Sequence, residues 1–193
     1  MAKQSISRLG CGLMSLALVG CAASSHITPP KRSVNEQLLL DQSLEQGLTN
    51  ASIPIPPGKT VALEVVGLTE DKDFVQAAFT HWLAQQGYPM PGNKKEEYLL
   101  RVMVHAFGTN VNNKFVGVPP ISGGLFPIAL PELALYKYQV QNAFTRFSMD
   151  IYDSASGRLL SSTPNCEGYT YLKDSTVFFG VTSKSSNLNP PVP

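Results

Sequence analysis

The stretch that most constrains the fold is FVGVPPISGGLFPIALP, residues 115–131, which carries no charge and contains four Pro and three Gly. Each Pro lacks an amide donor and holds the residue before it near extended geometry, while Gly favours turns. The stretch therefore predicts neither a helix nor a central strand. It cannot cross a membrane either, because irregular backbone in hydrocarbon would leave its amides unpaired. We expect a long apolar loop, which is an uncommon and often functional feature.

Two main interpretations of this loop are open. Its large apolar side chains either cover a part of the core that the helices leave open, or form an exposed surface for a protein partner or a second copy. Shallow insertion into the headgroup zone of a lipid bilayer is a third possibility. The candidate contact residues are Phe115, Val118, Ile121, Leu125, Phe126, Ile128 and Leu130.

Two helices are expected before the loop. Ser33 followed by Glu36 matches a capping box, which predicts a helix that begins next to it. A second helix is expected after a cap at Asp71 or Asp73, with Gly87 as its stop signal. The apolar positions expected to face the core are Val34, Leu38, Leu44 and Leu48, and then Phe74, Ala78, Trp82 and Leu83.

Strands are expected on both sides of the loop. Thr60–Leu68 predicts a buried strand, and residues 96–111 alternate as a half-exposed strand does, with Arg101 and His105 on the outer face. Residues 138–153 alternate in the same way, and Gly157 predicts a hairpin turn after them. A further strand and a last one near residues 175–182 complete the pattern. The inward positions are Tyr98, Leu100, Val102, Val104 and Ala106, and then Thr145, Phe147, Met149 and Ile151.

This order predicts a single α+β domain, in which two helices pack on a mostly antiparallel sheet that carries the long Pro/Gly-rich apolar loop. The expected organisation is a signal peptide over residues 1–20, a tether over 21–33, the domain over 34–182 and a flexible tail over 183–193. At 193 residues the chain is long enough for one domain with a substantial core.

The N-terminus has the layout of an export signal. Lys3 and Arg8 precede an apolar stretch that is too short for a transmembrane helix. The sequence LVGC, residues 18–21, resembles the lipobox of bacterial lipoproteins. The resemblance implies cleavage before Cys21 and acylation of its thiol and its amine. Several acyl chains anchor a protein stably where one does not, and Ala22 favours the outer membrane with the domain facing the periplasm.

The remaining composition excludes several classes of function. Loss of Lys3 and Arg8 with the signal would leave 13 basic against 14 acidic residues, which gives no basic face for nucleic acid. After the signal and the anchor, Cys166 is the remaining Cys, so no internal disulfide is expected, and a small half-buried residue is the favoured interpretation.

No motif predicts a catalytic, metal or cofactor site. The sequence GKT, residues 58–60, lacks the earlier Gly of a phosphate-binding loop and leads into a predicted strand. His26, His81 and His105 show no metal-ligand spacing, and Cys166 lies in no known nucleophile signature. The acidic residues around Asp71 are explained by helix capping. We therefore expect a non-enzymatic protein without a cofactor.

The second half of the chain resembles an uncharacterised family of bacterial lipoproteins. The runs VGVPP and PELALYK carry this resemblance, which covers about residues 95–182. It implies no activity and no site residues. The sequence thus favours an interaction or envelope-assembly component, which would contact an envelope protein or a second copy through residues 115–135. The alternative is a small-ligand-binding module for lipid or cell-wall fragments, with the same loop as a wall of its pocket.

Overall fold

The computed structural model describes residues 31–90, 92, 95–120, 131–178, 180–189. Arg32–Pro193 form one compact unit, and the arrangement below concerns the described part of it. The predicted signal peptide, Cys21 and most of the predicted tether lie outside the described residues, as do Ile121, Leu125, Phe126, Ile128 and Leu130 of the apolar loop.

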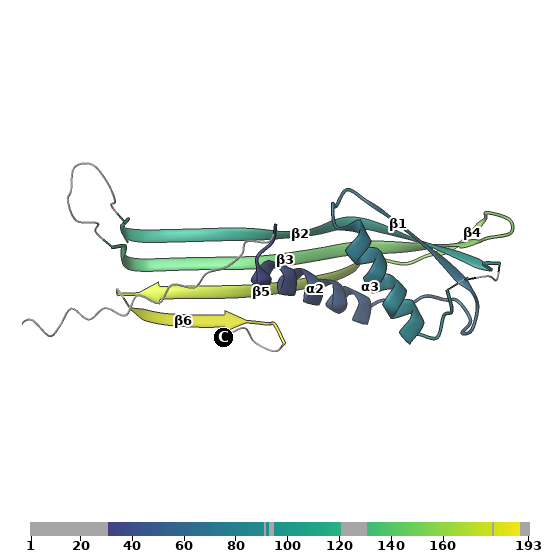
Figure 1. Ribbon diagram of the computed structural model, residues 1–193, viewed down its shortest axis with the longest axis horizontal. Helices are drawn as coiled ribbons and strands as arrows, with labels where there is room; N and C mark the ends of the chain where they lie inside the picture. The colour runs from purple at the N-terminus through teal and green to yellow at the C-terminus, as the bar shows by residue number, and fades with distance from the viewer. Residues whose placement is uncertain (1–30, 91, 93–94, 121–130, 179, 190–193) are drawn as a thin grey trace, which may run out of the picture. The chain divides into compact units, whose positions relative to one another are not determined.

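The described elements are two helices and six strands in the predicted order, except that the two strands predicted after Gly157 are three, with different bounds. They are α2 (Val34–Thr49), β1 (Val61–Gly67), α3 (Lys72–Gln85), β2 (Tyr98–Val118), β3 (Leu133–Asp153), β4 (Leu159–Ser162), β5 (Cys166–Val177) and β6 (Val181–Ser186). The strands form one sheet in the order β1-β2-β3-β5-β6, with β4 paired to β3 (Figure 1). Among the described strands, only the pair β1–β2 is parallel. The predicted α+β class is therefore confirmed.

The predicted capping box at the start of α2 is present. The Ser33 hydroxyl accepts from the Glu36 amide, and the Glu36 carboxylate accepts from the Ser33 amide at 2.8 Å. The turns also form as predicted, because Gly87 after α3 and Gly157 after β3 have φ of +81° and +67°. Asp71 occupies the N-cap position of α3, but its side chain makes no capping hydrogen bond.

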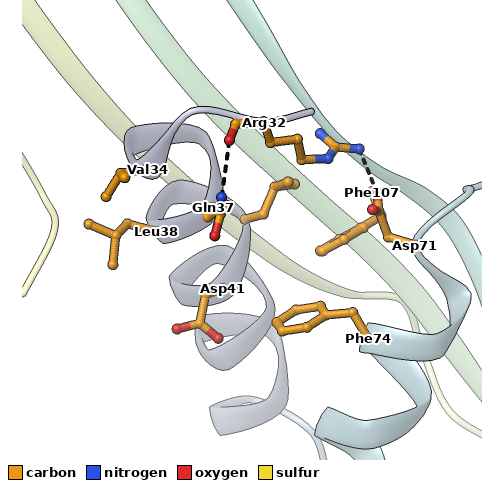
Figure 2. Close-up of a pocket in the computed structure, with 9 residues that line it drawn as sticks. Arg32, Val34, Gln37, Leu38, Asp41, Asp71, Phe74 and Phe107 are labelled. Carbon is orange, nitrogen blue, oxygen red and sulfur yellow. Dashed lines mark hydrogen bonds and ion pairs between the residues drawn. The ribbon is translucent and has the colours of Figure 1, made fainter. Parts of the chain in front are cut away.

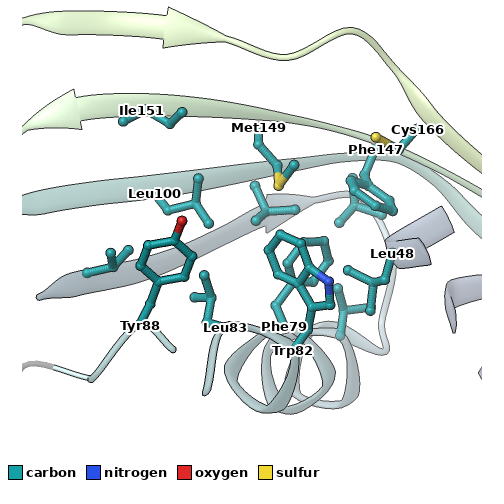
Figure 3. Packing of buried hydrophobic residues seen from close by; sticks show 14 of the residues in the cluster. Leu48, Phe79, Trp82, Leu83, Tyr88, Leu100, Phe147, Met149, Ile151 and Cys166 are labelled. Carbon is teal, nitrogen blue, oxygen red and sulfur yellow. The ribbon is translucent and has the colours of Figure 1, made fainter. Parts of the chain in front are cut away.

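The main core lies between the helices and one end of the sheet (Figure 3). At its centre the rings of Phe79 and Phe147 meet edge to face, with their centroids 4.9 Å apart. All four inward positions predicted for residues 138–153 are at most 2% exposed. A smaller cluster joins α2 to β3, β5 and the C-terminal segment; its members are Leu39, Leu40, Ala143, Leu172 and Leu188.

Three predicted core positions are wrong. Val34, at the start of α2, is 65% exposed. Phe74 is 44% exposed, because α3 instead turns Val75 and Phe79 toward the sheet. In β2 a bulge between Val104 and Ala106 shifts the alternation by one residue. Phe107, rather than Ala106, therefore packs against both clusters, since an extra residue on one strand reverses the faces that follow it.

Two predicted boundaries are also wrong. The strands on either side of the apolar loop are longer than predicted, because β2 extends to Val118 and β3 begins at Leu133, so residues 115–118 belong to a strand. Near the C-terminus the predicted last strand is a hairpin of β5 and β6, and β6 extends to Ser186. Leu188 is 5% exposed in the smaller cluster, so the described part of the predicted tail, through residue 189, belongs to the domain.

Candidate functional site

A pocket of about 470 Å³ lies between α2 and α3 and reaches the sheet at Phe107 (Figure 2). Its wall is mostly apolar. The rings of Phe74 and Phe107 are stacked, with centroids 6.2 Å apart and an interplanar angle of 22°. The pocket is lined by Arg32, Val34, Gln37, Leu38, Leu40, Asp41, Asp71, Phe74 and Phe107.

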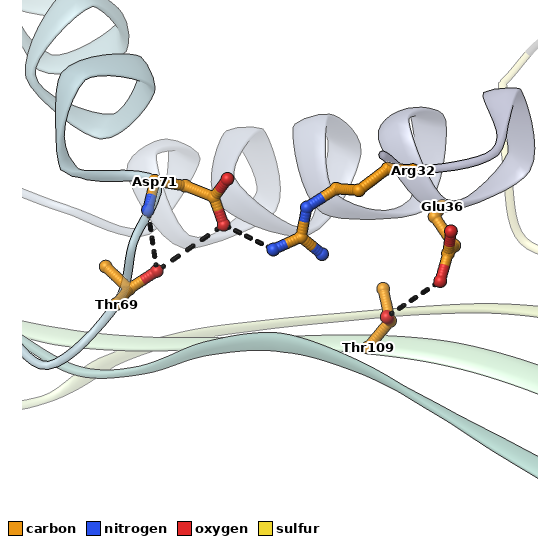
Figure 4. Close-up of polar contacts among 5 residues, drawn as sticks. All are labelled: Arg32, Glu36, Thr69, Asp71 and Thr109. Carbon is orange, nitrogen blue, oxygen red and sulfur yellow. Dashed lines mark hydrogen bonds and ion pairs between the residues drawn. The ribbon is translucent and has the colours of Figure 1, made fainter. Parts of the chain in front are cut away.

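An ion pair joins the beginnings of the two helices at this pocket (Figure 4). The Arg32 guanidinium donates to the Asp71 carboxylate at 2.6 Å. The Thr69 hydroxyl accepts from the Asp71 amide at 3.2 Å, which orients the carboxylate-bearing residue. Arg32 is held from a second side, because the Gln37 amide group donates to its carbonyl at 3.0 Å. The charge of Arg32 is therefore already compensated within the domain.

Asp41, on α2, differs from Asp71 in having no hydrogen-bond or ion-pair partner among the described residues. It lies beside Phe74 at the border between this pocket and a second hollow of about 660 Å³, which continues between the helices toward Trp82. The three charged residues of the first pocket carry a net charge of −1. Because Arg32 and Asp71 compensate each other, the excess charge is that of Asp41.

The second candidate surface is the distal end of the sheet, defined as residues 110–118 of β2, 133–142 of β3, 173–177 of β5 and the whole of β6. In Figure 1 this end extends to the left of the helices. Among the described residues, nine of the seventeen exposed large hydrophobic side chains lie here or in the adjoining turn. They are Val111, Phe115, Val116, Val118, Leu133, Leu135, Tyr136, Phe178 and Val181.

Hydrogen-bonded pairing brings these exposed side chains to one end of the domain. Val118 is paired with Leu133, and Phe115 is paired with Lys137. The Phe178 amide donates to the Leu135 carbonyl at 3.0 Å, which places the β5–β6 turn beside β3. The distal end thus combines apolar side chains from two hairpins that are far apart in the sequence.

Two of the predicted contact residues can be located. Phe115 and Val118 are 39% and 46% exposed on β2, and neither belongs to a core cluster of the described residues. Sequence reasoning missed the other parts of this surface, because it assigned Phe178 and Val181 to one predicted strand. It also missed the pocket. The alternating sequence gives no sign of the bulge after Val104, and this bulge brings Phe107 to the pocket.

The remaining chemical groups do not form a reactive cluster in the described part of the chain. The Cys166 thiol is buried in the main core, and this burial raises its pKa. His105 is exposed on β2, where its ring lies 3.0 Å from the Ser148 hydroxyl, and His81 contacts Gln85 on α3. No group of three metal-binding side chains is found among the described residues.

The GKT run, residues 58–60, leads into strand β1, as predicted from the sequence that follows it. Lys59 forms an ion pair with Glu97 at 2.7 Å, and this hydrogen bond and charge raise the pKa of Lys59.

None of the described helices is sufficiently long and apolar to span a membrane. In comparisons with known proteins, no family model and no curated protein matches this chain.

Proposed function

We propose that this chain is a lipoprotein of the outer membrane that faces the periplasm and works as a non-enzymatic interaction or envelope-assembly component. Cys21 carries the lipid, and the distal end of the sheet contacts a protein partner. The N-terminal pattern of Lys3, Arg8 and the LVGC run supports the anchor. The contact role is a separate part of the proposal and can be tested separately.

The observation that carries the contact role is the gathering of exposed apolar side chains at the distal end. Soluble domains seldom expose large contiguous apolar patches, and those that they expose mark contact sites. Val116 and Val181 are 57% and 69% exposed, although each lies in a paired strand. The distal end also carries five charged residues, and one of them, Lys137, is paired with Glu132 at 2.8 Å. The five are Lys114, Lys137, Lys173, Asp174 and Lys184. A partner that covers this end would remove apolar surface from water.

Site-specific photo-crosslinking in the native cell tests this role. A photoreactive residue replaces Val116 in the full chain, and a matched control replaces Leu159, which is 49% exposed on β4. We expect a discrete protein adduct from position 116 and a much weaker one from position 159. Mass spectrometry of the adduct identifies either a second copy or another envelope protein.

Equal crosslinking from both positions, or none from position 116, would contradict the contact role. Membrane fractionation of the Cys21→Ser variant tests the anchor independently. We expect that variant to leave the membrane fraction, because it lacks the acylated thiol. Retention in the membrane would contradict lipid attachment at Cys21 and would leave the contact test unaffected.

A second candidate function is the binding of a small ligand, and the pocket between α2 and α3 favours it. Its volume of about 470 Å³ lies within the range of ligand sites, and its wall is mostly apolar with a few polar groups. The sequence predicts the apolar loop as a wall of such a pocket, and none of the described residues of that loop, 115–120 and 131, lines this one.

A further inference from the structure

The pocket between α2 and α3 leaves apolar surface exposed that would normally be buried. Val34 is 65% exposed and Phe74 is 44% exposed, although both line a concave site. Phe74 and Phe107 present stacked rings from two different elements (Figure 2). A ligand with an apolar body would cover these side chains and gain hydrophobic free energy.

The charges of the pocket select the kind of polar group that such a ligand can carry. Asp71 holds the Arg32 guanidinium at 2.6 Å, so an anionic ligand would have to compete with an existing partner. Asp41 lines the same pocket without a partner among the described residues. A cation at this site would pair with Asp41, and the faces of Phe74 and Phe107 would attract it further.

We propose that this pocket binds an organic cation, namely an aromatic or short aliphatic group that carries an ammonium. The apolar body lies against Phe74 and Phe107, and the ammonium pairs with the Asp41 carboxylate. The Arg32–Asp71 pair stays intact and closes the pocket beside the beginnings of both helices. This inference rests on the second candidate function, ligand binding, and is independent of the contact role of the distal end.

Three matched probes test the proposal on the full chain. They are 2-phenylethylamine, 2-phenylethanol and 3-phenylpropanoate, which share the ring and differ in the charge of the polar end. NMR of the Leu methyl groups locates binding through Leu38 and Leu40, which line the pocket. We expect the amine to bind about fivefold more tightly than the alcohol, as an exposed ion pair allows. The propanoate should bind most weakly.

Two variants and one control assign the selectivity. Asp41→Asn keeps the size of the side chain, and we expect it to abolish the difference between the amine and the alcohol. Phe74→Leu keeps apolar bulk without a ring and should weaken amine binding about twofold to fivefold. Asp73→Asn is the matched control, because Asp73 is an exposed acid of α3 that does not line this pocket, and it should change nothing.

The possible failures can be told apart. Tighter binding of the propanoate, or equal binding of the amine and the alcohol, would overturn the cation proposal while leaving ligand binding in place. The cation proposal would also be overturned, and ligand binding left in place, if Asp41→Asn retained the preference for the amine. Absence of Leu38 and Leu40 shifts with all three probes would overturn the cation proposal and ligand binding together.

Discussion

The strands β2 and β3 pass through two regions of the sheet. In one region their large apolar side chains are buried, and in the other many of them are exposed. Where α2 and α3 cover the sheet, Phe147 and Met149 of β3 are fully buried. At the distal end of the same strand, Leu133 and Leu135 are each 45% exposed. The two strands pair antiparallel through both regions, with one register shift in each, after Val104 and after Val116 (Figure 1).

This difference shows that the length of a strand and the extent of the core are set separately. Backbone pairing and β-forming residues such as Val116 and Tyr136 extend the ladder, whereas the helices decide which part of it is covered. Stability should therefore depend on side chains in the covered region, and the proposed contact with a protein partner should depend on the distal end. Matched substitutions, one in each region, can test this division.

The largest difference is expected between Phe147→Ala and Phe115→Ala. Phe147 is 0% exposed and packs against Phe79, so its removal leaves a cavity and should lower the free energy of unfolding by about 3–5 kcal/mol. Phe115 is 39% exposed outside the core, so its removal should cost at most about 0.5 kcal/mol. Urea unfolding followed by the fluorescence of Trp82, which packs in the main core, measures both. Similar losses in the two variants would break the division.

The sequence predicts the covered region better than the distal end, for physical reasons. The alternation of β3 is imposed by a core that buries every second side chain, so the inward positions from Thr145 to Ile151 are predicted correctly. The distal end has no such constraint, and β2 continues through residues 115–118, where the Pro/Gly-rich stretch predicts no strand. Proline acts only from Pro119 onward, and the residues before it, Phe115–Val118, remain free to pair.

The candidate pocket was less predictable, because it depends on long-range geometry. The sequence contains Arg32 and Asp71, but nothing local indicates that they meet across 39 positions. Asp71 was expected to cap α3 and instead directs its carboxylate to Arg32. The bulge after Val104, which brings Phe107 to the pocket, has no clear signal in the alternating sequence.

A second matched pair compares two strand glycines. A Cβ at Gly168 would overlap the Ser43 carbonyl oxygen and lie 2.9 Å from the Gly47 amide nitrogen, because α2 packs closely on β5 there. Gly168→Ala should therefore push the helix from the sheet and cost about 1–3 kcal/mol or more. Gly108 has open space around it, so Gly108→Ala should be neutral or stabilise by up to about 1 kcal/mol. Thermal unfolding of both variants measures whether each substitution lowers or raises the stability. A loss of stability in both would contradict the explanation by the space around each glycine.

The smallest effect is expected for two serine hydroxyls. Ser43, fully buried on α2, lies 2.6 Å from the Thr145 hydroxyl, so Ser43→Ala leaves a buried hydroxyl without this partner. The cost should be about 1–2 kcal/mol, reduced by the higher helix propensity of Ala. The exposed Ser175 hydroxyl donates to the Ser183 carbonyl at 3.3 Å at the distal end, and Ser175→Ala should cost less than about 0.5 kcal/mol.

The double variant Ser43→Ala, Thr145→Val separates the hydrogen bond from other effects of the first substitution. Because it removes both hydroxyls, it should recover most of the stability that Ser43→Ala loses. Urea unfolding of the single and double variants measures this recovery. If the double variant is less stable than Ser43→Ala alone, the Thr145 hydroxyl stabilises the fold even without Ser43, which would contradict its being left unsatisfied in Ser43→Ala. In that case the covered region would depend on a specific polar contact as well as on apolar packing.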